Sequence, residues 1–150
     1  MASSPKSQTS PLLPPTSKDH LSNTPNRLTQ GAINVLSITR LVAGTACVIA
    51  PGFTTGLFRI PVSGQALILP RIFGVREGVL AELLWTAEGT QSDKWELKRA
   101  LWAGVAADTL DVASCAFGLA TGALSRPAAG LFGGGATIFL ALGAIGLRGV

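Results

Sequence analysis

The sequence predicts an all-α fold, a four-helix transmembrane bundle that follows a disordered N-terminal tail. The first observation is composition: 47% of the 150 residues are hydrophobic and mean hydropathy is +0.44. Only 13% are charged, about half of the roughly 25% that is typical of a soluble domain. The second observation is that the apolar residues gather in four long stretches. The third is that residues 1–30 are instead rich in Ser, Thr and Pro.

The predicted tail, residues 1–30, reads MASSPKSQTSPLLPPTSKDHLSNTPNRLTQ. Because this composition offers too little apolar surface to offset the entropy lost on ordering, we expect it to be disordered. It has no continuous apolar run of the kind found in a secretory signal peptide. The membrane domain is therefore expected to cover residues 31–150.

A helix needs about 20 mainly apolar residues to cross the hydrocarbon core of a bilayer. Four ranges meet this requirement, at about 31–50, 67–87, 100–121 and 127–147. Their connections are short, so consecutive helices are expected to pack antiparallel. The second range is the least typical because it contains several charged residues, and an interfacial or re-entrant helix is the alternative there.

The placement of Lys and Arg predicts the orientation. With four spans, the tail, the second loop and the C-terminus lie on one side of the membrane. They contain Lys6, Lys18, Arg27, Lys94, Lys98, Arg99 and Arg148, whereas the opposite loops contain only Arg59 and Arg126. Both termini are therefore expected in the cytosol, with the endoplasmic reticulum as the working assumption for the membrane. Since no basic run occurs, we expect no nucleic-acid partner.

Ionisable residues fall near the middle of three of the predicted spans. They are Arg40, Arg76, Glu77, Asp108 and Asp111. Each would cost about 2.5–3.5 kcal/mol at the bilayer centre on insertion scales. We therefore expect these side chains to face one another, because opposite charges recover much of that cost.

Helical spacing supports this expectation, because residues three or four apart share a face. One small or polar stripe in the first span contains Ser37, Arg40, Gly44 and Cys47, and another in the third contains Gly104, Asp108, Asp111 and Cys115. In the second span Arg71, Gly74, Gly78 and Glu82 share a stripe from which Arg76 and Glu77 point away. That helix should therefore touch more than one neighbour, and Gly74 and Gly78 would allow a close approach.

Two interpretations of this charged layer remain open. In one, the ion pairs only fix the register of the helices. In the other, they form a polar pocket that a lipophilic substrate reaches within the bilayer. Asp108, Asp111 or Glu77 is then the candidate acid or base, Arg40 and Arg76 are charge partners, and Arg71, Gly74 and Glu82 are weaker candidates for substrate binding. No metal or cofactor is expected, because the only histidine is His20 in the tail and all-carboxylate ligands beside arginines suit a metal poorly.

Two motifs resemble a known group of proteins. The segments are Arg71-Ile-Phe-Gly-Val-Arg76-Glu77 and Ala107-Asp108-Thr-Leu-Asp111, preceded by Pro51-Gly-Phe-Thr-Thr-Gly-Leu57-Phe-Arg-Ile-Pro61. Residues 33–147 thereby resemble small four-helix membrane proteins of uncharacterised function from fungi and some bacteria. Some fungal members lie near natural-product biosynthetic genes. The resemblance implies the topology and a role in secondary-metabolite biosynthesis, and it implies no established activity.

The leading functional hypothesis is a multi-pass membrane protein that binds or acts on a lipophilic metabolite. Its enzymatic form would be a cofactor-free isomerase or cyclase that works by acid–base chemistry. The first alternative is a non-catalytic scaffold or accessory protein. The second is a small proton-coupled transporter, which would have to form a homo-oligomer, and Gly130 and Gly134 of the Gly-rich fourth helix offer a contact for it.

Overall fold

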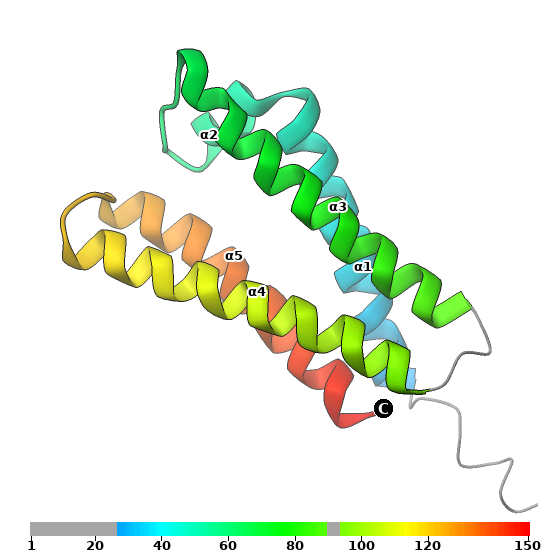
Figure 1. Ribbon diagram of the computed structural model, residues 1–150. Coiled ribbons are helices and arrows are strands. Elements are labelled where there is room, and N and C mark those ends of the chain that lie inside the picture. The colour runs from blue at the N-terminus through cyan, green and yellow to red at the C-terminus, as the bar shows by residue number, and fades with distance from the viewer. Residues whose placement is uncertain (1–26, 90–93) are drawn as a thin grey trace, which may run out of the picture.

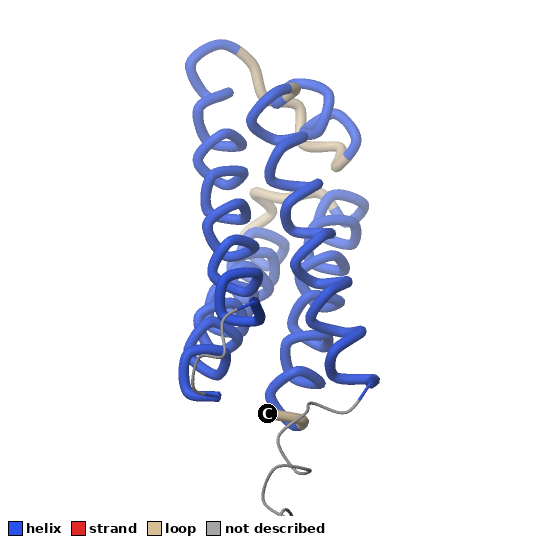
Figure 2. Tube along the Cα trace, turned by 90° about the vertical axis from the view of Figure 1, so that its right-hand side faces the viewer, coloured by secondary structure: helices blue, strands red, loops and turns tan. Residues whose placement is uncertain are grey.

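The computed structural model describes residues 27–89 and 94–150 (Figure 1). Over these residues the chain is helical and contains no strand, which confirms the predicted all-α class. The elements are α1 (Arg27–Ile49), α2 (Pro51–Leu57), the 3-10 turn η1 (Gly64–Leu67), α3 (Ile68–Gly89), α4 (Lys94–Ala120) and α5 (Arg126–Arg148). Loops occupy only the ends of the long helices (Figure 2).

The four long helices coincide with the four predicted ranges, but two of them begin earlier than expected. Residues 27–30 form the start of α1 rather than the end of the tail, and Thr29 there is buried. Residues 1–26, which carry the rest of the predicted tail, lie outside the described residues. Helix α4 begins at Lys94, six residues before the predicted range. Leu97 is buried and extends the apolar face of α4 into the segment that was expected to be a polar connection.

The short helix α2 was not predicted, and local hydrogen bonds explain it. Pro51 occupies its first turn, where the missing N–H is not needed. The hydroxyl groups of Thr54 and Thr55 donate to the Pro51 carbonyl oxygen at 3.0 and 2.9 Å. The helix ends at Leu57, and two residues later Arg59, with a φ of 56°, lets the Ile60 N–H donate to the Thr55 carbonyl oxygen, as in a Schellman motif. This geometry folds α2 back against α1 and α3.

The long helices form two pairs, α1 with α3 and α4 with α5 (Figure 1). Contacts between α1 and α5 and between α3 and α4 join the pairs into a bundle in which consecutive long helices run in opposite directions. Helix α3 thus packs against both α1 and α4, as its polar sequence predicted.

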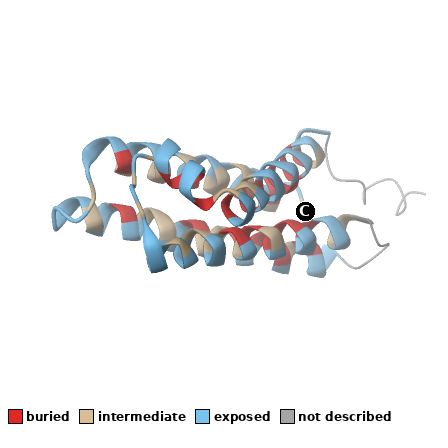
Figure 3. Cartoon of the chain, turned by 90° about the horizontal axis from the view of Figure 1, so that it is seen from above, coloured by how far each residue is buried: buried red, intermediate tan, exposed pale blue. Residues whose placement is uncertain are grey.

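Several charged side chains are buried and many large apolar side chains are exposed, unlike in a typical soluble protein. Figure 3 shows which parts of each helix are buried. Among the largest fully buried side chains are those of Arg40, Glu77 and Asp108. The exposed side chains include many large apolar ones, such as Val42 on α1, Leu69 on α3, Leu110 on α4 and Ile138 on α5, each more than half exposed. Such a surface suits lipid, because an apolar solvent favours apolar side chains outside and charges inside.

Three helices, α1, α4 and α5, are long and apolar enough to cross a membrane. This is consistent with the predicted membrane protein. Helix α3 contains 22 residues and is thus about 33 Å long at a rise of about 1.5 Å per residue. It is not among the three because it carries charged residues such as Arg76 and Glu77.

The closest approach between helices in the α1–α3 pair occurs at two glycines. A Cβ atom added to Gly74 would lie 2.5 Å from the Gly44 carbonyl oxygen, and one added to Gly44 would lie 2.6 Å from the Gly74 carbonyl oxygen. Only glycine therefore fits at either position. Arg40 and Glu77 each lie one helical turn from this crossing, so the close contact brings their side chains together.

We predict that Gly74→Ala destabilises the folded protein whereas Gly78→Ala does not. A methyl group at residue 74 collides with α1 backbone, and overpacking of this kind typically costs about 1–3 kcal/mol. A Cβ at Gly78 meets no atom within 4 Å, and alanine is the better helix former. Unfolding of both variants in mixed detergent micelles, followed by circular dichroism, measures the difference. Equal stability of the two variants would contradict the contact.

Candidate functional site

Three layers follow one another along the axis of the bundle. At the end where the described chain begins and ends, apolar side chains form a core, composed of Ile33, Leu36, Leu84, Leu97, Ala100 and Leu101. The charged side chains form the middle layer. Beyond them, toward α2, lies a pocket. The charged layer therefore lies between the apolar core and this pocket.

The middle layer is an alternating series of negative and positive side chains, Asp108–Arg40–Glu77–Arg76–Asp111, which we call the ionic chain. Arg40 Nη2 donates to Asp108 Oδ2 and Arg40 Nη1 donates to Glu77 Oε2, both at 2.5 Å. Arg76 Nη2 donates to Glu77 Oε1 at 2.6 Å. Arg76 also holds Asp111 with two parallel bonds, of 2.9 Å from Nη1 and 2.5 Å from Nη2. The series links α1, α3 and α4.

Two phenylalanines and a glycine complete the surroundings of the arginines. The guanidinium carbon of Arg40 lies 4.9 Å from the centre of the Phe139 ring of α5, and that of Arg76 lies 4.9 Å from the Phe73 ring. Both distances are typical of cation–π contacts. A Cβ added to Gly104 would lie 3.3 Å from Arg40 Nη2, so the small residue makes room for the guanidinium beside α4.

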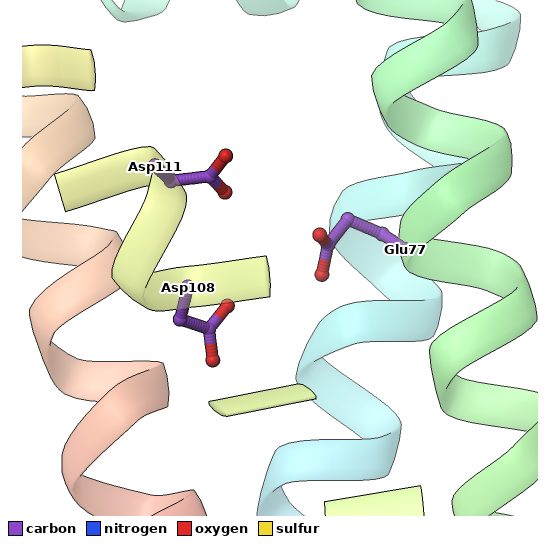
Figure 4. Close-up of side chains that lie close together, drawn as sticks. All are labelled: Glu77, Asp108 and Asp111. Atoms are coloured by element: carbon purple, nitrogen blue, oxygen red, sulfur yellow. The ribbon is translucent and has the colours of Figure 1, made fainter. Parts of the chain in front are cut away.

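The two ends of the ionic chain differ in exposure. The side chains of Arg40, Glu77 and Asp108 are at most 1% exposed, whereas those of Asp111 and Arg76 are 17% and 34% exposed. Asp108 and Asp111 of α4 point toward Glu77 of α3 (Figure 4). Three carboxylates share two guanidinium groups, which leaves one negative charge in excess unless a proton or another cation is bound.

The carboxylate oxygens of Glu77, Asp108 and Asp111 lie within 4.8 Å of one another. This spacing alone would allow a metal ion. Both arginines, however, already donate hydrogen bonds to these oxygens, so a metal ion would have to displace them. The expectation of no metal and no cofactor stays a prediction.

The pocket has a volume of about 230 Å³ and lies beside the ionic chain. Its wall is almost entirely apolar and comes mainly from α1, α2, α3 and α5, with Asp111 from α4. The lining residues are Ala43, Ala46, Cys47, Thr54, Leu57, Phe58, Phe73, Glu77, Asp111, Phe132, Gly135, Ala136 and Phe139. Glu77 and Asp111 are its two carboxylic acids, so the ionic chain meets the pocket at these carboxyl groups and not at Asp108.

The structure confirms that the five charged residues of the predicted layer face one another. The predicted faces of α3 were partly wrong: Gly74 and Glu77 are buried together, whereas Arg71 and Glu82 are exposed. Glu77 is three residues after Gly74, which places both on the side that α1 covers. Arg71 and Glu82 do not line the pocket and Gly74 is occupied by its contact with Gly44, so their role in substrate binding stays a prediction.

The aromatic residues of the pocket were missed by the sequence analysis. Phe132 and Phe139 are seven residues apart on α5, two helical turns, which places them on one face. This spacing was a readable signal in a helix that was otherwise assigned only to closing the bundle. Phe58 carried no such signal, because its position depends on how α2 folds back.

Comparison with protein-family models, with curated proteins and with solved structures finds no match. The resemblance to small four-helix membrane proteins therefore stays a prediction. The fold and the site define the class by themselves: an all-helical protein with three helices of membrane-spanning length and character, which encloses a buried ionic chain beside an apolar pocket.

We predict that Arg40→Met strongly destabilises the fold, because it leaves Glu77 and Asp108 buried without their shared partner. Breaking a buried ion pair on one side typically costs about 3–5 kcal/mol. Arg71→Met on the exposed face of α3 is the matched control and should change little. The fraction of monodisperse protein in mild detergent, and its unfolding midpoint in mixed micelles, report the effect.

Adding Glu77→Gln and Asp108→Asn to Arg40→Met should restore part of the lost stability, since no buried charge is then left unpaired. If Arg40→Met proved as stable as the Arg71→Met control, the ionic chain would not be what holds the helices in register.

Proposed function

We propose that this chain is a four-span membrane protein that binds a lipophilic small molecule in the pocket and acts on it by acid–base proton transfer. The reaction that we propose is a cofactor-free isomerisation or cyclisation. The observation that carries the proposal is the position of the Glu77 and Asp111 carboxyl groups in the wall of an otherwise apolar pocket. Apolar pockets with a few convergent polar groups are the usual form of small-molecule sites.

The geometry favours Asp111 over Asp108 as the acid or base. Asp111 lines the pocket and is partly exposed, whereas Asp108 is 1% exposed and does not line it. Arg76 fixes the orientation of the Asp111 carboxyl with two hydrogen bonds. Glu77 is the second carboxyl group in the wall, so it is the candidate for the other proton transfer of the reaction. Arg40 and Arg76 balance its charge.

A proton-shuttle reaction at this site needs no external reagent. When one proton is bound among the three carboxyl groups, the ionic chain is neutral. A neutral Asp111 would give its proton to one carbon of a double bond, while the Glu77 carboxylate would take a proton from the saturated carbon bonded to the other carbon of that double bond. Atoms and electrons balance, the double bond moves, and the shared proton is restored within the ionic chain.

The fourth span and the orientation belong to the same proposal. The length of α3 and its exposed apolar residues, such as Ile72, Val75 and Val79, support a span, because its charged residues Arg76 and Glu77 have partners inside the bundle. With four spans the Lys and Arg distribution supports cytosolic termini. A role in secondary-metabolite biosynthesis rests on the resemblance alone.

A non-catalytic scaffold is the second candidate function. The observation that favours it is the complete burial of Arg40 and Asp108, which make their bond away from the pocket. This half of the ionic chain has a structural role under either function. For the transporter hypothesis, Gly130 and Gly134 have open space where a Cβ would lie, and the oligomer stays a prediction.

The experiment that tests the proposal compares Asp111→Asn with Glu96→Gln in cells that lack the gene. Deletion followed by metabolite profiling identifies the accumulated precursor, and complementation restores the product. We expect Asp111→Asn to lower the rate of product formation by about 10²–10⁴-fold, which is typical of losing a general acid or base. Glu96→Gln, at an exposed carboxylate on the same helix α4, should behave as wild type.

Asp108→Asn tests the structural half of the ionic chain, which both candidate functions share. It should give less folded protein in detergent, with unchanged activity per folded molecule if the protein is an enzyme. Full product formation by folded Asp111→Asn would remove the catalytic proposal and favour the scaffold.

A further inference from the structure

The walls of the pocket are unusually aromatic. Four of the six phenylalanines of the chain line it, namely Phe58, Phe73, Phe132 and Phe139. Phe132 lies at the centre of the group: its ring is 5.7 Å from the Phe58 ring in an edge-on arrangement, and 5.2 Å from the Phe73 ring at a tilt of 54°. Differently inclined rings present both faces and edges to the enclosed space.

The faces of aromatic rings carry partial negative charge and attract cations. Two of these rings already show this preference, because Phe139 lies under the Arg40 guanidinium and Phe73 under that of Arg76. The ionic chain adds a full negative charge to the partial negative charge of the ring faces. Its carboxylates outnumber its guanidinium groups by one, and two of those carboxylates reach the pocket.

The two arginines do not cancel the preference of the pocket for a cation. Arg40 is not a lining residue of the pocket. Arg76 directs its Nη1 and Nη2 groups to Asp111 and Glu77, so an incoming anion would have to replace existing ion pairs. With a neutral ligand, a bound proton has to compensate the excess negative charge. A cation compensates it directly and also contacts the ring faces.

We propose that the natural ligand of the pocket is a lipophilic amine, whose ammonium group binds against Asp111 and Glu77 among the four phenylalanines. This inference rests on the proposed function, because it names the class of molecule that the same pocket takes. The volume of about 230 Å³ exceeds the roughly 150 Å³ cavity that holds benzene in another protein. The pocket therefore accommodates a substituted ammonium group or one ring, while an attached hydrocarbon chain extends into lipid.

The experiment measures binding of two probes to the full chain in uncharged maltoside micelles. One probe is decyltrimethylammonium. The other is its uncharged isostere, in which a quaternary carbon replaces the nitrogen. Isothermal titration calorimetry, below the concentration at which either probe forms micelles, gives both affinities. We expect the ammonium probe to bind at least about tenfold more tightly, as a cation among desolvated aromatic faces requires.

Two substitutions locate the site. Phe132→Leu keeps an apolar side chain and removes the central ring, so it should lower the preference for the ammonium probe about fivefold. Phe117→Leu, at a phenylalanine that is 72% exposed on α4, is the matched control and should leave the preference unchanged. If Phe132→Leu does not fold, Phe58→Leu replaces it, since that ring lies at the edge of the group.

The outcomes separate this inference from the function on which it rests. Equal affinity for the two probes, or tighter binding of decanoate, overturns the amine and leaves a lipophile-binding pocket in place. Binding of neither probe overturns both. A preference for ammonium that Phe117→Leu removes as readily as Phe132→Leu would place the cation outside the pocket and overturn the assignment.

Discussion

The fold depends on one buried guanidinium group. Arg40 is 0% exposed and contacts carboxylates from two other helices. Removing three charges from solvent is costly, and the cost is recovered only when the partners stand at fixed positions. This requirement sets the register of α1 against α3 and α4. The glycines around it, Gly44, Gly74 and Gly104, provide the close backbone approach and the space that such positions need.

The same constraint is consistent with a lipid environment for a chain that has so few charged residues and three helices long and apolar enough to cross a membrane. In water, Arg40, Glu77 and Asp108 would be most stable on the surface, and the apolar residues of four helices would compete for one small interior. In lipid the preference reverses, because apolar side chains are stable outside and the ion pairs are stable only inside. Composition, hydropathy and burial are therefore each consistent with a lipid environment.

Sequence patterns predicted the helices and the charged layer because both follow from local periodicity. An apolar run of about 20 residues has one stable form in a bilayer, and mid-span charges such as Arg40 and Asp108 have few acceptable partners. The pocket was not predictable in this way. Its walls depend on how α2 folds back to place Phe58, and on which face of α3 is covered by α1. Both are properties of packing between helices, and the sequence also left Arg71 and Glu82 as weaker candidates beside Glu77.

The unequal ends of the ionic chain give the bundle a sidedness. The apolar core lies at the end that holds the described chain termini, and the pocket lies on the other side of the ionic chain, beside α2. If the helices cross a bilayer, the core and the pocket therefore lie toward opposite leaflets. A proton exchanged between Asp111 and a molecule in the pocket would then be exchanged on the pocket side of the ionic chain, while Arg40 and Asp108 stay buried.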